Sequence, residues 1–174
     1  MTVFSVDVEA DGPIPGENDY SMVSFGAVIV EEGLTRTFYG KLRPISDKFI
    51  PEALAVSKHS REETMQFPEP AATMQEFADW INANKSGRAF LFSDNNGFDA
   101  MFISWYFHHF LGENPFGHSS TNISSLYKGM EKSVFVNHKR LRKTKHTHHP
   151  VDDAKGNAEA LLAMKELGLK INFA

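Results

Sequence analysis

Apolar and polar residues alternate over much of the first forty positions, and a period of two is typical of β-strands. The alternation predicts strands over residues 3–8, 20–30 and 34–42. A loop rich in glycine and proline, residues 10–19, follows the first strand, and a turn at residues 31–33 follows the second. Because short connections join antiparallel neighbours, we expect these three strands to form an antiparallel meander.

From residue 51 onward, apolar residues recur mainly at the spacing of helices. This spacing predicts helices over residues 51–56, 70–84, 97–111, 121–129 and 152–167. Two short apolar runs, residues 88–93 and 169–173, predict further strands. Strands followed by alternating helices and strands are typical of a mixed α/β sheet, and the length favours a single domain over residues 1–174.

Composition narrows the class of protein. The chain has no cysteine, which excludes disulfides, thiolate catalysis and cysteine-based zinc sites. Its start lacks the basic region of a secretory signal, and no run approaches the ~18 apolar residues of a membrane helix. We therefore expect a cytoplasmic protein with no membrane contact. The formal net charge of −4, taken alone, argues against a nucleic-acid partner.

The first predicted strand carries two acidic residues, Asp7 and Glu9. Alternate residues of a strand point to the same face, so these two carboxylates lie side by side. Neighbouring carboxylates repel each other, and a cation between them relieves the repulsion. An exposed edge strand with two solvated acids explains the pair equally well, and this alternative stays open.

Further acidic residues fall in the first turns of two predicted helices: Asp99 in one, and Asp152 with Asp153 in the other. Acids at these positions also complement the helix dipole. This effect alone accounts for all three residues without a functional site. A histidine-rich stretch precedes the final helix. Its residues His146 and His148, two positions apart, leave open a zinc site made of histidines.

As a set, these residues come from the ends of three separate elements, which can converge in a mixed α/β sheet. Several carboxylates together favour hard cations such as Mg²⁺ or Mn²⁺ over zinc. Two such ions about 3.5–4 Å apart are the arrangement that in-line phosphoryl displacement uses. A neutral histidine with a pKa near 6.5 is suited to accept a proton from the attacking water.

Three motifs in this order resemble those of the DEDDh family of 3′–5′ exonucleases, which includes proofreading exonuclease subunits, ribonuclease T and oligoribonuclease. The motifs span nearly the whole chain, and their combination is what makes the resemblance specific. They are Asp7-Val8-Glu9 on a strand, Asn95-Asn96-Gly97-Phe98-Asp99 opening a helix, and His148 five places before Asp153. The neighbouring His149 and Asp152 leave the register of the third motif ambiguous.

The resemblance implies an α/β protein with an RNase H-like fold, in which helices flank a five-stranded mixed sheet. It also implies the residues of the site, with His148 as general base and two Mg²⁺ or Mn²⁺ ions held by Asp7, Glu9, Asp99 and Asp153. The implied activity is hydrolysis at the 3′ end of single-stranded DNA or RNA, with release of nucleoside 5′-monophosphates. Whether DNA or RNA is preferred leaves no readable motif. Several relatives form homodimers, so a homodimer is expected by analogy alone.

Charge is distributed unevenly along the chain. Residues 128–145 hold seven basic side chains and one acidic one, a net charge of +6, while the other residues carry −10. This basic segment leads directly to His148, and we predict that it contacts the phosphates of a strand. The predicted substrate-binding residues are Gly12, Asn95, Lys139, Arg140 and Arg142. Met22, Phe25 or an aromatic residue of the 97–111 helix is a candidate to stack on the terminal base.

Three alternatives remain beside the exonuclease. One is a non-catalytic nucleic-acid-binding module on the same fold, although such a module gains nothing from concentrating acids near phosphates. The second is a hydrolase of short oligonucleotides or small phosphodiesters. The third is a protein that binds zinc through the histidine-rich stretch.

Overall fold

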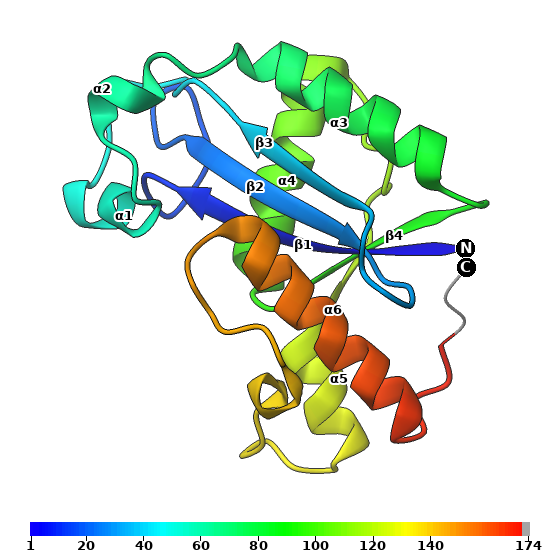
Figure 1. The fold of residues 1–174 in the computed structure, drawn as a ribbon. Coiled ribbons are helices and arrows are strands. Elements are labelled where there is room, and N and C mark those ends of the chain that lie inside the picture. The colour runs from blue at the N-terminus through cyan, green and yellow to red at the C-terminus, as the bar shows by residue number, and fades with distance from the viewer. Residues whose placement is uncertain (172–174) are drawn as a thin grey trace.

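A computed structural model describes residues 1–171 of the chain. Its centre is a five-stranded mixed sheet with the strand order β3-β2-β1-β4-β5 (Figure 1). The strands are β1 (Thr2–Ala10), β2 (Met22–Ile29), β3 (Thr37–Lys41), β4 (Ala89–Ser93) and β5 (Ser120–Asn122). β1, β2 and β3 pair antiparallel as predicted, whereas β4 and β5 join them in parallel.

The helices follow the apolar spacing closely. They are α1 (Pro51–Val56), α2 (Arg61–Thr64), α3 (Pro70–Asn84), α4 (Asn96–Leu111), α5 (Ile123–Met130) and α6 (Pro150–Glu166), and η1 (His138–Leu141) is a single 3₁₀ turn. α2 was not predicted, because four residues are too short for a periodic signal. Its start nevertheless has a local cause, since the Ser60 hydroxyl accepts a hydrogen bond from the backbone N–H of Glu63.

The fifth strand was predicted in the wrong place. Residues 169–171 form no strand, and the rest of that predicted strand lies outside the described residues. The strand is instead β5, three polar residues at the beginning of what the pattern predicts as the 121–129 helix. It carries no alternation that a sequence pattern can detect. The helix begins after it, where the Asn122 side chain accepts from the N–H of Ser125.

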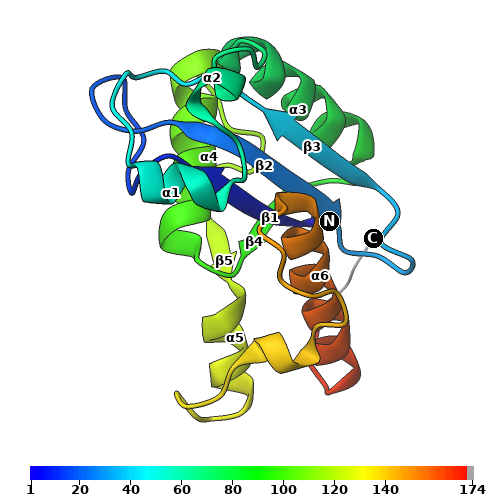
Figure 2. The same cartoon turned by 60° about the vertical axis from the view of Figure 1, so that its left-hand side comes forward.

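Helices cover both faces of the sheet, with α4 behind it and α6 in front in Figure 1. The layer of α3 and α4 encloses a core rich in phenylalanine, to which β1 contributes Phe4, Val6 and Val8. The opposite layer of α5 and α6 packs through small and aliphatic residues such as Ala154 and Leu161. Turned by 60°, the molecule shows α5 and the segment after it extending below the sheet (Figure 2).

α6 lies unusually close to β2, and a glycine is the reason. A Cβ atom at Gly26 would lie 2.3 Å from the backbone nitrogen of Val151 and 2.4 Å from the carbonyl carbon of Pro150. Gly26 is also the cross-strand partner of Asp7. The missing side chain therefore lets the first turn of α6 sit directly beside Asp7.

No helix among residues 1–171 is long and apolar enough to cross a membrane.

We predict that Gly26→Ala lowers the free energy of unfolding by ~1–3 kcal/mol, because the added methyl group meets backbone that can yield only if α6 moves. Denaturant-induced unfolding measures this change. The matched control is Gly129→Ala, where nothing lies within 4 Å of the added Cβ. Equal stability of Gly26→Ala and the wild type would refute this account of the packing.

Candidate active site

The carboxylates of β1 and α6 meet at one end of the sheet. Val6 and Val8 point into the aromatic core, so Asp7 and Glu9 face the layer of α6. There they meet Asp153, in the first turn of α6, and carboxylate oxygens of the three residues lie within 4.8 Å of one another. The structure thus brings together acids that are almost 150 positions apart in the sequence.

The fourth acid, Asp99, is buried in the first turn of α4. Its Oδ1 accepts from the backbone N–H of Val8 at 3.2 Å, and its Oδ2 accepts from the N–H of Asn95 at 3.2 Å. Val8 lies between Asp7 and Glu9 on β1, so the first bond fastens the Asp99 carboxylate to the acidic strand. In addition to the larger effect of burial, the negative charge of Asp99 raises the pKa of Asp7 and of Glu9.

Burial raises the pKa of three of these acids, and the closeness of the acids to one another raises it further in Asp7 and Glu9. Burial, followed by the charges of the other three acids, raises the pKa of Asp7. Burial also raises the pKa of Glu9, from 4.5 to about 7, with smaller contributions from Asp153 and Asp99. The pKa of Asp99 rises to about 7 because its desolvation outweighs its hydrogen bonds. The metal-free folded state therefore loses stability as the pH rises towards 7, since the folded chain holds protons that the unfolded chain has released.

The loop before α6 is organised around Asp153. Oδ2 of this residue accepts from the backbone N–H of His148 at 3.0 Å, and Oδ1 accepts from the N–H of Thr147 at 3.2 Å. His148 has a φ of +58°, a left-handed conformation that non-glycine residues rarely adopt. Nδ1 of His146 lies 2.9 Å from Oδ1 of Asp153. The acid is thus held from several sides.

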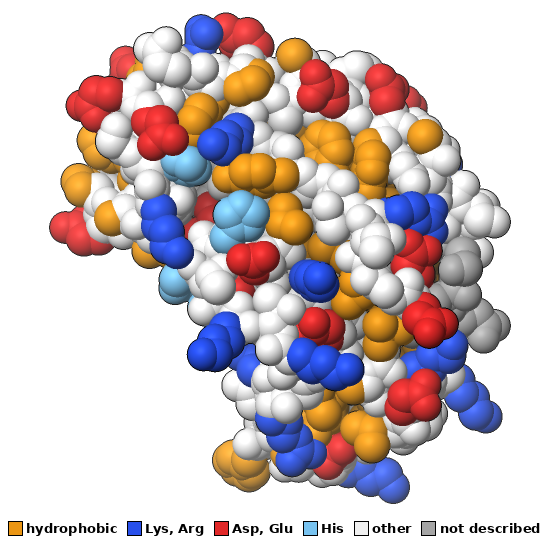
Figure 3. Space-filling model, viewed as in Figure 1, with side chains coloured by type: hydrophobic (Ala, Val, Ile, Leu, Met, Phe, Trp, Pro, Cys, Tyr) orange, Lys and Arg blue, Asp and Glu red, His pale blue; other side chains and the backbone are white. Residues whose placement is uncertain are grey.

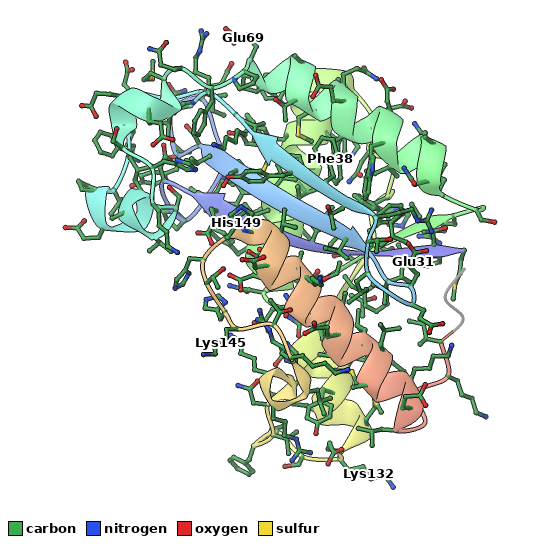
Figure 4. The ribbon with its side chains drawn as sticks, viewed as in Figure 1. Glu31, Phe38, Glu69, Lys132, Lys145 and His149 are labelled. Atoms are coloured by element: carbon green, nitrogen blue, oxygen red, sulfur yellow. The ribbon has the colours of Figure 1, made fainter. Side chains whose placement is uncertain are left out.

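The two histidines of the ambiguous third motif point to different neighbours. Nδ1 of His148 lies 4.0 Å from Oε1 of Glu9, beside the carboxylates. The ring of His149, labelled in Figure 4, packs against Tyr39 with 4.8 Å between ring centroids. Asp152 accepts a hydrogen bond from the Thr147 hydroxyl and is not part of the cluster that Asp7, Glu9 and Asp153 form. This geometry favours His148 and Asp153 as the pair, while their roles stay predictions.

Arg142 does not lie on the surface, where contact with a strand was predicted. Its side chain is 5% exposed, and its Nη2 donates to Oδ1 of Asp153 at 2.9 Å. Gly156 makes room for it, because a Cβ there would lie 2.2 Å from Nε of Arg142. The basic segment folds back over α6 at this point, which the spacing of charges in a loop does not reveal.

The other predicted substrate residues make different contacts. Nζ of Lys139 is 3.0 Å from Oδ2 of Asp94, and Asn95, the next residue, is exposed at the start of α4. Arg140 lies over the ring of Tyr127, and its Nε donates to the phenol oxygen at 2.7 Å.

Gly12 was predicted to allow close approach of a backbone beside the carboxylates. A Cβ at this position would lie 2.1 Å from ring atoms of Tyr20, so the glycine accommodates that ring. Met22 and Phe25 are fully buried, and neither is accessible for stacking on a base.

A groove of about 370 Å³ opens beside Glu9. Apart from Glu9 it is apolar, and its lining consists of Glu9, Ala10, Gly12, Pro13, Ile50, Ala53, Val56 and Phe98. The segment leading into α1 and α1 itself form one wall, which the sequence patterns predicted as a helix but did not connect with the site. The buried Asp11 holds this region through Arg61, whose Nη1 donates to Oδ2 at 3.0 Å.

Lys58 contacts the site but was not predicted from the sequence. Its Nζ donates to the carbonyl of Thr147 at 2.6 Å, and its positive charge lowers the pKa of Glu9 against the effect of burial. The bond links the segment after α1 to the histidine loop. A single lysine between two short helices carries no sequence signal that would have marked it.

The chain is similar in sequence to a bacterial exonuclease. The chain is 43% identical over 129 residues to the 3'-5' DNA exonuclease Cap18 of Escherichia coli, and the match covers 72% of this chain and 67% of that protein. No protein-family model matches the chain.

Several solved structures share the fold. The nuclease domain of 3'hExo, described as a DEDDh family member bound to rAMP, has a TM-score of 0.78 at 16% identity and covers 99% of this chain and 96% of that one. Cell-death related nuclease 4 has a TM-score of 0.74 at 14% identity, and the match covers 96% of this chain and 64% of that one. Exonuclease I of E. coli with a dT13 oligonucleotide has a TM-score of 0.66 at 13% identity, and the match covers 95% of this chain and 40% of that one.

At these identities the structural neighbours establish the fold, an RNase H-like α/β fold with a five-stranded mixed sheet, as predicted. The relative from E. coli establishes the activity of the family, and the motifs that suggested it are the ones the fold assembles at one end of the sheet. The chain therefore belongs to the DEDDh family of 3′–5′ exonucleases.

Proposed function

We propose that the protein removes nucleoside 5′-monophosphates one at a time from the 3′ end of single-stranded DNA. We further propose that Asp7, Glu9, Asp99 and Asp153 hold two divalent ions, Mg²⁺ or Mn²⁺, for this reaction. The observation that carries the proposal is the meeting of β1 and α6 carboxylates within 4.8 Å, with Asp99 fastened to the same strand. Membership of the family supports dependence on a divalent metal in general. The identity of the metal and the number of ions are the further claims of this proposal.

The residues at the site fit divalent cations. All four candidate ligands are carboxylates, the hard oxygen donors that Mg²⁺ and Mn²⁺ prefer. Burial and, to a smaller extent, mutual repulsion raise the pKa of Asp7 and Glu9, and a cation among them would favour the charged forms instead. Bound divalent ions would polarise the phosphate and lower the pKa of a water molecule.

His148 is suited to the role of general base. It stands beside Glu9 at the mouth of the site, and its side chain is 48% exposed. In the proposed reaction it accepts a proton from the attacking water and passes it to solvent. The water oxygen bonds to phosphorus while the bond from phosphorus to the 3′ oxygen breaks. The departing nucleotide keeps the phosphate on its 5′ oxygen, and the freed 3′ oxygen takes up a proton from solvent to become the 3′ hydroxyl of the shortened strand.

Arg142 acts through another residue in this proposal. It is buried and donates to Asp153, so it positions that ligand and contacts no substrate. Arg142 is therefore not one of the phosphate contacts in this proposal. Lys139, Arg140 and Asn95 remain candidates, since all three are exposed.

The apolar groove beside Glu9 fits the terminal nucleotide. Ile50, Val56 and Phe98 offer apolar surface to a base or sugar, directly next to the proposed metal ligands. We favour DNA because the relative at 43% identity is a DNA exonuclease. The homodimer expected by analogy finds no support among residues 1–171, and it is not part of the proposal.

We predict that purified protein releases mononucleotides from end-labelled single-stranded DNA when Mg²⁺ or Mn²⁺ is present. Asp7→Asn and Asp153→Asn should each lower turnover by ~10³-fold or more, a barrier increase of about 4 kcal/mol. Asp152→Asn is the matched control, since this acid lies outside the carboxylate cluster. The same assay is run in parallel on RNA. If no mononucleotides are released from DNA with either ion, the proposal is overturned.

A second prediction separates the two histidines. His148→Ala should lower turnover by ~10²–10⁴-fold, the usual contribution of a general base, and should flatten the acid side of the pH–rate profile. His149→Ala should cost less than about tenfold, because its ring packs on Tyr39. If His149→Ala were the damaging variant, the assignment of the third motif would be wrong.

A further inference from the structure

We propose that the loop between α5 and η1, residues 131–137, is a second binding surface for the same DNA strand, where Phe135 stacks on a base upstream of the reacting 3′ nucleotide. This inference rests on the proposed function and extends it to the length of strand that the enzyme holds. The loop lies within the basic segment of residues 128–145, but it bears none of the motif residues and none of the individually predicted substrate-binding residues.

Phe135 is exposed to an unusual degree. Its exposed fraction is 95%, and that of the adjacent Val134 is 71%, while the other exposed large hydrophobic residues range from 36% to 59%. Hydrophobic side chains this exposed, next to each other at the tip of a loop, mark a surface that contacts something else. Figure 2 shows the segment after α5 at the lower end of the molecule, away from the sheet.

The turn holds the ring outward through its own hydrogen bonds. The N–H of Ser133 donates to the carbonyl of Lys128 at 3.0 Å, and the N–H of Phe135 donates to the Ser133 hydroxyl at 3.3 Å. Lys132 adopts a left-handed φ of +52° between them. The exposure of Phe135 thus belongs to a shaped turn at the end of α5.

The charges around the loop favour a nucleic acid over a protein surface. Lys128 precedes the loop and Lys132 lies within it, and neither side chain has an ion-pair partner among residues 1–171. The one acid of the loop, Glu131, is paired with Arg140 at 3.6 Å. Arg140, nearby in sequence, is 61% exposed despite its contacts with Tyr127 and Glu131. An exposed aromatic ring close in sequence to unpaired lysines is a combination suited to single strands, because bases stack on the ring while phosphates meet the cations.

The loop is continuous with the active site. η1 follows it directly, and two residues of this segment contact the site: Lys139 in η1 pairs with Asp94, next to Asn95, and Arg142 after η1 pairs with Asp153. In Figure 4, Lys145 lies between His149, at the start of α6, and Lys132, at the lower end of the molecule. Figure 3 shows further Lys and Arg side chains along this flank. A strand whose 3′ end occupies the groove can therefore follow positive charge to Phe135.

The test measures binding of fluorescently labelled single-stranded DNA of 5, 10 and 20 nucleotides by anisotropy, in EDTA so that no strand is cut. Phe135→Ser should weaken binding of the 20-mer about 5–100-fold, the range expected for one stacked base, and the loss should grow with strand length. Lys132→Gln should reduce the salt dependence by about one unit of slope. The matched control is Leu167→Ser, a substitution of another exposed hydrophobic residue, 59% exposed at the end of α6.

Two results would overturn the inference. One is wild-type affinity of Phe135→Ser for DNA of every length. The other is a wild-type dimer that Phe135→Ser converts to a monomer without a length-dependent loss of DNA binding, which would make the loop an interface between copies of the chain. The outcome is separable from that of the proposed function, because the anisotropy assay needs no cleavage. An active enzyme with an unaffected Phe135→Ser variant refutes only the role of the loop.

Discussion

The repulsion among four carboxylates at one end of the sheet is the constraint on which the rest of the site depends. Asp7, Glu9, Asp99 and Asp153 are brought together although burial raises the pKa of Asp7, Glu9 and Asp99, and the charges of other acids in the cluster further raise the pKa of Asp7 and Glu9. Such an arrangement destabilises a protein that has nothing to place between the acids. The fold must therefore hold each carboxylate firmly, and it must leave the cluster accessible to cations.

Each element holds its acid by a different physical means. The pleat of β1 turns Asp7 and Glu9 to one face while Val6 and Val8 anchor the strand in the aromatic core. Asp99 is fastened by backbone N–H donors, and its place in a first helical turn favours negative charge. Asp153 depends on the close approach of α6 at Gly26 and on the buried Arg142. The packing of α6 therefore determines the geometry of the site.

Much of this could be predicted from sequence, because local rules governed it. The alternation in β1 put two acids on one face, and the helical spacing put Asp99 and Asp153 in first turns. What could not be predicted depends on contacts between distant segments. Nothing local indicates that Arg142 turns inward against Gly156, that Gly12 accommodates Tyr20, or that Lys58 reaches the histidine loop. β5 was missed because three polar residues at a sheet edge have no pattern.

The most direct test of the central claim is calorimetric titration of Mn²⁺ into the metal-free protein at pH 7, repeated in buffers of different ionisation enthalpy. The account predicts two ions per chain and release of protons on binding, because Glu9 and Asp99, with pKa values of about 7, must give up their protons to act as ligands. It also predicts loss of this binding in Asp99→Asn. Binding of no Mn²⁺, or unchanged binding by Asp99→Asn, would contradict the account.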